Sequence, residues 1–453
     1  MSLVEIQDDG LVVINDPLVS VSGLLEEARL HSKQEQANKK RFNYSSTNSN
    51  SGMYLQRLWI ENDEIAQEIE QRPWKSLEIV SCQGSKLPWL VGTALKQQSL
   101  KKFALRKIAS RLESCIGAIR VSGLSHVQEL TLEMAFSERS GQSLASALDT
   151  MTSPRCCSLV DLKLERCSFI IPSALSAFAE GLKYNTSLKS LSLIKCKLRD
   201  DDFQALFPCL PSTLENLDLT GNYCRHQFRG LLHSKVQCIN LTNQHPGEFG
   251  ASLEFSQIGS DLSSNKTLRS LDLSFNMLTI ADIEGLVDAL AIAGSHSGIE
   301  SLNLMSNHLD DNAIQYMGSK LPEMLSLKRL DISSNRFGDE GAVALLRGLR
   351  HNVTLCHLEM PRGFEKEDEI RHLLALNWGG RRLLQQRPGR EGHEKLSRNS
   401  IKQPKVPLGL WPSVFERVNS LCVDNNGISL VNMRASVMLF LLQEGPLWIG
   451  REH

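Results

Sequence analysis

A short phrase rich in leucine returns ten times along the middle of the chain and constrains its fold more than any other feature. Each copy is apolar at its first, fourth and sixth positions, and most copies carry Asn or Cys at the ninth position. Strong copies begin at Leu159, Leu188, Leu214, Leu268, Ile299 and Leu327, and weaker ones at Leu100, Val127, Val236 and Leu355. The nine steps from Leu100 to Leu355 average about 28 residues, a period typical of stacked repeats.

The spacing within the phrase predicts a short β-strand. Alternate side chains of a strand share a face, so the fourth and sixth positions point together into a core while the third, fifth and seventh form the opposite face. An inward Asn at the ninth position can satisfy backbone groups of the turn that follows. Cys167 and Cys196, which replace that Asn in two copies, are expected to act as small buried residues.

The stretch after each predicted strand has the periodicity of an amphipathic helix, seen best at residues 283–290 and 337–349. Strand, crossover helix and parallel strand form a right-handed connection. Strands stack about 4.8 Å apart, whereas packed helices need about 8–10 Å, so the array must curve with its strands inside. The predicted fold is α/β: a horseshoe solenoid with parallel strands on the concave face and helices on the convex face.

At these residues the chain resembles leucine-rich-repeat proteins of the ribonuclease-inhibitor-like class, whose units alternate a strand and a full α-helix. The resemblance covers residues 74–362 and implies the same leucine-rich-repeat fold. The copy that begins at Val236 departs from the pattern, because Gln244 stands where Asn is expected and a Gly- and Ser-rich stretch follows at residues 247–264. A local irregularity is expected there.

The flanks divide the chain into three segments. Residues 1–52 are acidic and then Ser/Asn-rich, which predicts a largely flexible segment. Residues 53–362 form the solenoid, with a helical pattern at residues 53–70 as its N-terminal cap. Residues 363–453 are predicted to be helical with a basic linker at residues 381–405, and they resemble a C-terminal segment of microalgal leucine-rich-repeat proteins. A helix at residues 369–384, interrupted at Gly379, and a cap anchored by Trp411 and Phe415 are expected.

Charge and cysteine usage exclude several classes of protein. Fifty Lys and Arg against 51 Asp and Glu leave a net charge of −1, which disfavours a nucleic-acid or membrane-surface binder. Eleven Cys without C-x-x-C spacing form neither a disulfide framework nor a zinc finger. The first residues lack the basic region of a secretory signal, and the longest apolar run near the end, at residues 437–442, is too short to cross a bilayer. The expected location is cytoplasmic, or alternatively nuclear.

Motifs that carry chemistry are absent from the sequence. There is no phosphate-binding glycine loop and no H-E-x-x-H pair, and the His residues lack ligand spacing. At residues 294–298 a loop resembles a nucleophile elbow but has His296 where Ser is required. The neighbours Cys356 and His357 would point to opposite faces of a strand. The chain is therefore expected to be no enzyme and to need no metal or cofactor.

The polar face of the strands is the remaining candidate site, and a protein is the expected partner. The early units offer basic residues and the fifth positions of the later units are acidic, so a partner with complementary charges fits this face. The candidate partner-binding residues are Arg106, Lys163, Asp218, Asn240, Asp272, Asn303, Asp331 and Glu359. Three alternatives stay open: a regulator of a small GTPase, by analogy with the Ran GTPase activators of this fold, a substrate receptor for ubiquitin ligation, and RNA binding through residues 381–405. The partner's identity and the oligomeric state are not indicated.

Overall fold

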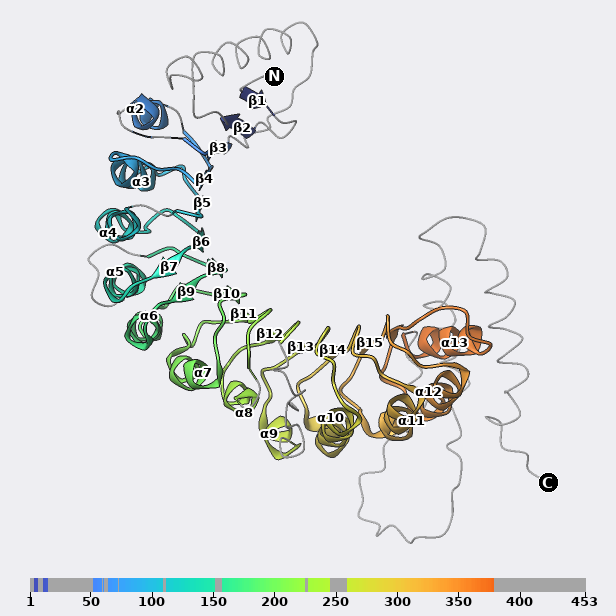
Figure 1. The fold of residues 1–453 in the computed structure, drawn as a ribbon. Coiled ribbons are helices and arrows are strands. Elements are labelled where there is room, and N and C mark those ends of the chain that lie inside the picture. Colours follow the sequence, from blue (N-terminus) through green and yellow to red (C-terminus); the bar gives the residue numbers. More distant parts are fainter. Residues whose placement is uncertain are drawn as a thin grey trace, which may run out of the picture. The chain divides into compact units, whose positions relative to one another are not determined.

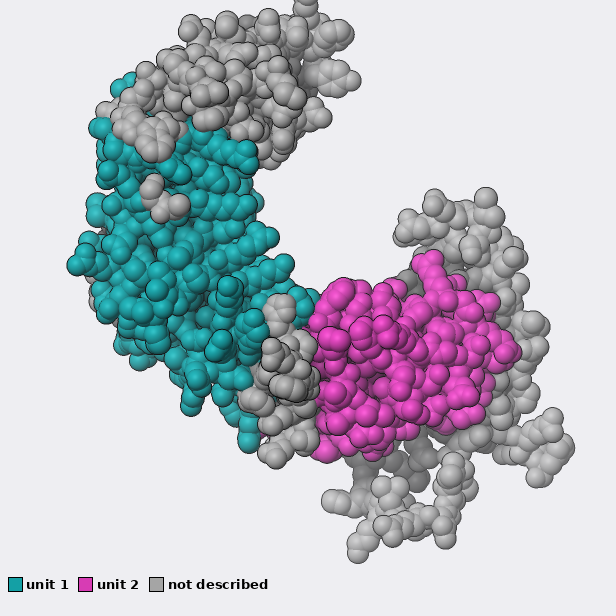
Figure 2. All heavy atoms as spheres, viewed as in Figure 1, with its two compact units in different colours: residues 1–251 teal, residues 252–453 magenta. Residues whose placement is uncertain are grey.

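The computed structural model describes residues 4–6, 11–14, 52–58, 60, 64–71, 73–108, 111–150, 157–224, 227–244 and 259–378. The chain divides into two compact units, unit 1 at residues 1–251 and unit 2 at residues 252–453 (Figure 2). Within each unit, parallel strands line one side and helices the other, and the unit curves with its strands inside (Figure 1). Each unit thus has the predicted leucine-rich-repeat construction.

Unit 1 holds one long sheet and seven helices among its described residues. The sheet strands, in spatial order, are β1 (Val4–Ile6), β2 (Leu11–Ile14), β3 (Gly52–Gln56), β4 (Ser76–Val80), β5 (Lys102–Arg106), β6 (Glu129–Glu133), β8 (Asp161–Glu165), β10 (Ser190–Ile194), β11 (Asn216–Asp218) and β12 (Cys238–Asn240). All neighbours pair in parallel except β1 with β2. The helices are α2 (Glu64–Gln71), α3 (Leu87–Leu95), α4 (Leu112–Ser122), α5 (Glu138–Leu148), α6 (Pro172–Lys183), α7 (Asp200–Leu206) and α8 (Phe228–Leu232). Two short strands, β7 (Ala135–Phe136) and β9 (Ser168–Phe169), pair separately.

Unit 2 repeats the same alternation of strand and helix. Its strands are β13 (Ser270–Asp272), β14 (Ser301–Asn303), β15 (Arg329–Asp331) and β16 (His357–Glu359), all parallel. Its helices are α9 (Gly259–Ser264), α10 (Ile280–Ala293), α11 (Asp311–Lys320), α12 (Asp339–His351) and α13 (Glu367–Trp378). The helices lie side by side on the outer side of the unit, opposite the concave side that the strands line (Figure 1).

The strand phrase buries the side chains that its periodicity predicts. In β10, Leu191 and Leu193 are fully buried, and the same holds for Leu162 and Leu164 of β8. The fifth position between each pair, such as Lys163, remains partly exposed. Burying one such Leu contributes about 1.5–3 kcal/mol, so the stacked leucines are the main source of stability.

The buried Asn at the ninth position works as predicted. Asn222 Oδ1 accepts from the N–H groups of Cys196 and Leu198, and its Nδ2 donates to the carbonyls of Leu193 and Leu219. Gln244 stands in for this Asn, since its Oε1 accepts from Cys224 N–H and its Nε2 donates to Leu219. The longer side chain thus preserves the hydrogen bonds at the irregular copy.

A second set of asparagines closes the turns before the strands. Asn185 is 2% exposed, its Oδ1 accepts from the N–H groups of Ser187 and Leu188, and its Nδ2 donates to the Leu148 carbonyl. Asn265 and Asn352 accept from the equivalent N–H groups. These Asn-x-Ser/Thr triplets are therefore structural parts of the repeat.

The N-terminal part of the solenoid differs from the sequence prediction. Residues 53–56 belong to strand β3 and not to a helical cap, and the helix α2 begins only at Glu64. Two strands, β3 and β4, precede the first copy recognised in the sequence, and β1 and β2 lie inside the segment expected to be flexible. The helical prediction at 53–56 was wrong because pairing with β4 satisfies that backbone, a contact that local periodicity does not show.

Helix α13 lies within the segment predicted to be helical at residues 363–453. Helix α13 ends at Trp378, directly before Gly379, and packs against α12 as the next helix of the array. Asn377 Nδ2 donates to the carbonyls of Asn352 and Leu355, which ties α13 to the last repeat. The basic linker at 381–405 and the cap residues Trp411 and Phe415 lie outside the described residues.

Candidate binding surface on the strands

The pairing register brings the fifth positions of successive strands side by side. In unit 1 this row runs from Glu78 through Ala104, Thr131, Lys163, Ser192, Asp218 and Asn240. In unit 2 the fifth-position row consists of Asp272, Asn303, Asp331 and Glu359. Arg106 lies two residues beyond Ala104 on the same face of β5. Each unit thus gathers its predicted residues on one surface, which we call the strand face.

The fifth-position acids have a structural task that the sequence analysis missed. Asp331 Oδ1 accepts from the N–H of Ser333 at 2.9 Å and from its hydroxyl at 2.6 Å. Asp272 and Asp218 hold Ser274 and Thr220 in the same way. One carboxylate oxygen of each acid therefore fixes the turn that leaves the strand. The recurring Asp-x-Ser/Thr pattern is the signal that could have revealed this.

The second carboxylate oxygen distinguishes these acids. Asp272 Oδ2 accepts from Asn303 Nδ2 at 2.8 Å. Asp331 Oδ2 has no hydrogen-bond donor within the part of the chain that the structure describes. Asp331 consequently presents an ionic acceptor to the strand face while its other oxygen keeps the turn intact.

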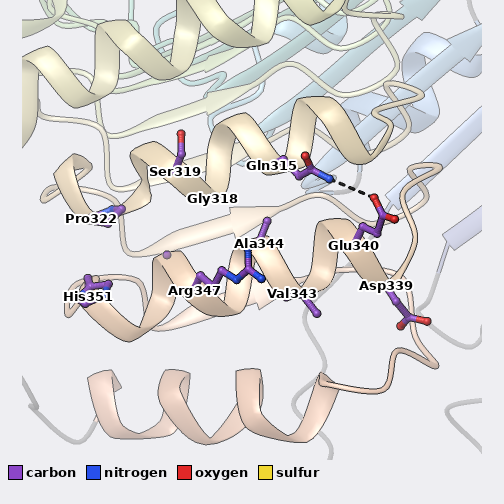
Figure 3. A pocket seen from close by; sticks show the side chains of 11 residues that line it. Gln315, Gly318, Ser319, Pro322, Asp339, Glu340, Val343, Ala344, Arg347 and His351 are labelled. Atoms are coloured by element: carbon purple, nitrogen blue, oxygen red, sulfur yellow. Dashed lines mark hydrogen bonds between the residues drawn. The ribbon is translucent and has the colours of Figure 1, made fainter.

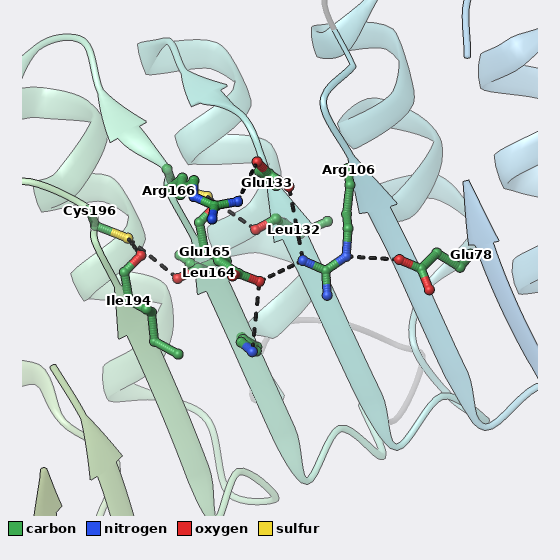
Figure 4. A network of polar contacts seen from close by, with 11 residues as sticks. Glu78, Arg106, Leu132, Glu133, Leu164, Glu165, Arg166, Ile194 and Cys196 are labelled. Carbon is green, nitrogen blue, oxygen red and sulfur yellow. Dashed lines mark hydrogen bonds and ion pairs between the residues drawn. The ribbon is translucent and has the colours of Figure 1, made fainter. Parts of the chain in front are cut away.

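In unit 1 the charges around Arg106 are paired with one another (Figure 4). Arg106 lies 2.9 Å from Glu78, 2.5 Å from Glu165 and 3.9 Å from Glu133. Lys163 contacts Glu165 at 3.7 Å, and Arg166 contacts Glu133 at 3.4 Å. Three acids thus meet three bases, so the charges predicted for a partner at Arg106 and Lys163 are already compensated within the chain.

Hydrogen bonding within this cluster changes the ionisation of Glu165. The guanidinium of Arg106 donates to the Glu165 carboxylate and holds its pKa below the usual value. A carboxyl with a lowered pKa in the folded state stabilises the fold at neutral pH and loses that contribution as the pH falls through its folded-state pKa.

We therefore expect Glu165→Gln to be less stable than the parent at pH 7, with a difference that shrinks as the pH falls from about 5 to about 3. Urea unfolding at several pH values measures it. The matched control is Glu180→Gln, because Glu180 forms only an exposed pair with Lys183 and should give a much smaller difference. A pH-independent difference for Glu165→Gln would contradict the ionic role of Glu165.

The strand face of unit 2 contains a hollow of about 400 Å³. Its polar lining comes from the fifth-position row and from a parallel third-position row, Ser270, Ser301, Arg329 and His357. Among the described residues, no ion pair or hydrogen bond engages the charged groups of Arg329 and Glu359. The hollow therefore presents the carboxylates of Asp331 and Glu359 beside the guanidinium of Arg329, and among the described residues Arg329 has no carboxylate partner of the kind that Arg106 has in unit 1. Arg329 and His357 were not among the predicted residues, although their third positions could have identified them.

A second hollow, of about 830 Å³, lies between helices α11 and α12 of unit 2 (Figure 3). Its middle is lined by small residues, Gly318, Ala344 and Gly348, since the helices approach closely there. Gln315 donates to Glu340 at 3.5 Å across the gap. This hollow follows from the close packing of the two helices.

The described residues contain no group of three or more His, Cys, Asp or Glu side chains placed to hold a metal ion. No helix among them has the length and apolar character needed to span a membrane. Burial raises the pKa of the Cys82 thiol to about 11 and that of Cys115 to about 12, which makes both poor nucleophiles.

Comparisons with known proteins agree with the repeat assignment. The family profile described as "Leucine Rich repeat" matches residues 264–280 and 324–346. "NACHT, LRR and PYD domains-containing protein 5" of Bos taurus is 25% identical over 307 residues, covering 58% of this chain and 28% of the relative. Protein 12 of the same series from Homo sapiens is 30% identical over 188 residues, covering 40% of this chain and 17% of the relative. This chain thus spans less than a third of the length of either relative.

Among solved structures, the leucine-rich repeat-containing protein LegL7 from Legionella pneumophila is similar to this chain. It is 16% identical, with a TM-score of 0.40, and the match covers 71% of this chain and 96% of LegL7.

Proposed function

We propose that this leucine-rich-repeat chain is a non-catalytic protein-binding scaffold that holds a segment of another protein on the strand face of unit 2. The observation that carries the proposal is the contrast between the two strand faces. In unit 1 Arg106 is surrounded by three carboxylates, whereas in unit 2 Arg329 and Glu359 have no charged partner among the described residues.

The hollow favours a partner because its charged groups are pre-positioned. Asp331 is held by its own turn and the strands fix the spacing of both rows, so binding would order few side chains of the scaffold. Charges at a preformed surface steer association and select the partner more than they add affinity. A protein segment with basic side chains facing Asp331 and Glu359, and an acidic one facing Arg329, fits this arrangement.

The finer predictions from sequence remain part of this proposal. The alternation of strand and full helix supports the ribonuclease-inhibitor-like type of repeat. Asp272 and Asn303 are proposed as flanking contacts in the fifth-position row of unit 2, and Asp218 and Asn240 as contact residues of the strand face of unit 1. No feature of the site specifically favours the regulator of a small GTPase or the ubiquitin-ligase receptor.

The test uses short synthetic peptides and a change that removes charge without breaking the turns. The double variant Asp331→Asn and Glu359→Gln keeps an oxygen at position 331 to accept from Ser333, so the fold should persist. Fluorescent 12-residue Gly/Ser peptides carrying two Lys residues should bind the full chain in anisotropy titrations. We expect the double variant to weaken this binding by about tenfold or more, and 0.5 M salt to weaken it further.

The matched control is Glu323→Gln, which removes one exposed acid after α11, away from the strand face. It should leave the affinity within about twofold, because a single distant exposed charge is largely screened. Equal binding of the lysine peptides by the parent and the double variant would overturn the proposed site.

A further inference from the structure

The turn between β13 and α10 in unit 2 exposes three large apolar side chains within six residues. Phe275 is 47% exposed, Met277 57% and Ile280 46%. We call these three residues the apolar rim. The rim begins directly after the Asp272–Ser274 contact, and the Phe275 N–H donates to the Met305 carbonyl at 3.0 Å, so it borders the strand face.

The neighbouring repeats show that the fold does not require apolar residues at these positions. The three rim residues stand five positions before, three positions before and at the first residue of α10. The next two repeats have polar residues at the same positions relative to α11 and α12. These residues are Ser306, His308 and Asp311 in the first, and Ser334, Arg336 and Asp339 in the second. Only the rim, among these three aligned turns, replaces polar with large apolar side chains.

The backbone of the rim makes this replacement costly. Phe275 has φ 58° and Met277 φ 52°, both in the left-handed region. This conformation costs an L-residue about 1–2 kcal/mol, and Gly, Asn and Asp adopt it most readily. Elsewhere in the repeats the same conformation falls mostly on polar residues, including Ser81, Lys107 and Ser334. A Phe that is 47% exposed in this conformation gains less from the core than a buried one, so burial alone does not explain it.

We propose that the apolar rim is a specificity-determining contact for the partner segment and receives a bulky apolar side chain of that segment. The inference rests on the proposed function, because the basic residues of the segment would lie over Asp331 and Glu359. Charge selects this occupant: Asp331 lies two strands from β13, where the rim begins, so an apolar residue with Lys or Arg a few positions away gains both burial and charge pairing.

The geometry of the strands sets the spacing of the peptide. The rim follows β13 and Asp331 lies on β15, two strands or about 10 Å away, which an extended peptide covers in about three residues. The probes are therefore fluorescent 12-residue Gly/Ser peptides with two Lys residues, as in the test of the proposed function. The first peptide contains the two Lys residues and no apolar residue. In a second set, each peptide also contains one Phe, placed at a different position within four residues of the first Lys. A third set contains the Phe without the Lys residues.

We expect the best peptide with Phe and Lys to bind the full chain at least tenfold more tightly than the peptide with Lys alone. The variant Phe275→Ser with Met277→His, which copies the residues of the next repeat, should remove that gain and leave the affinity of the Lys peptide unchanged. Its melting temperature should equal or exceed that of the parent, which separates lost recognition from unfolding. The control Ile292→Ser, at a 74% exposed residue of α10, should keep the gain.

The outcomes separate this inference from the proposed function. If the Lys peptide binds and depends on Asp331 and Glu359 but Phe adds nothing, or its gain survives in the rim variant, the rim inference is overturned and the scaffold proposal stands. If no Lys peptide binds, the proposed function fails first. A further peptide has the sequence of this chain's own residues 398–417, which combines basic residues with Trp411 and Phe415. If it bound more tightly than the best peptide with Phe and Lys, the rim would be assigned to a segment of this chain and the inference of a separate partner protein would be overturned.

Discussion

Replacing Asn222 with Ala should lower the free energy of unfolding of unit 1 by about 3–5 kcal/mol, since each buried polar group left unsatisfied costs about 1–3 kcal/mol. The Asn222 side chain is fully buried and joins two neighbouring turns. Its loss leaves the N–H groups of Cys196 and Leu198 without the oxygen that accepts from both, and the Leu193 carbonyl without its amide donor. Ala also leaves a small cavity.

Chemical denaturation followed by circular dichroism measures this loss, and amide hydrogen exchange at Cys196 and Leu198 should speed up. The matched control is Asn216→Ala, because Asn216 lies on the same repeat but is exposed on β11. That change should stay within about 0.5 kcal/mol. Comparable effects of the two substitutions would show that the buried asparagine does not hold the turns together.

The second large effect is expected at Gly181, where helices α5 and α6 meet. A Cβ built at Gly181 would lie 2.4 Å from the Cα of Ala145 and 2.6 Å from its Cβ. Backbone atoms cannot move aside as the end of a long side chain can, so Gly181→Ala must push the helices apart. Overpacking of this kind costs about 1–3 kcal/mol, more than the 0.5–1 kcal/mol that Ala gains over Gly in a helix.

The matched control is Gly117→Ala in helix α4, for which we expect the opposite effect on stability. Nothing lies within 4 Å of a Cβ built there, so Gly117→Ala should stabilise the protein by about 0.5–1 kcal/mol. Thermal and urea unfolding of both variants test the pair. If Gly181→Ala were as stable as Gly117→Ala, the close approach of α5 and α6 would be wrong.

The sequence predicted the features that repeat locally. Leu191 and Leu193 are buried, Asn222 bonds the turns, and Asp272, Asn303, Asp331 and Glu359 share one row, because each follows from a fixed position within the unit. A parallel pairing of equivalent strands carries equivalent positions to the same face, so one repeat suffices to place the others. The Asp-x-Ser/Thr turn was just as readable and was overlooked.

Features that depend on contacts between distant residues were not predictable from the pattern. Arg106 and Glu165 are 59 positions apart, and their pairing turned an expected partner-binding cation into part of an internal cluster. Strand β3 lacks the full phrase, and its assignment needed the hydrogen bonds of a neighbouring strand. The repeat of strand β4 carries Trp74, Leu77, Ile79 and Cys82 at the phrase's positions, so it was readable from the sequence and was overlooked. The strain at Phe275 is a backbone property that no side-chain pattern reveals.

The amino-acid sequence alone determined the repeating unit, its buried leucines and the row of polar residues, since hydrophobic burial with a period of two is encoded within a few neighbouring residues. Only the tertiary structure decided which of those polar residues keep their charge available. Charge compensation depends on distances of a few ångströms between side chains from different repeats, as at Arg106 with its three carboxylates and at Arg329 and Glu359 without such partners among the described residues.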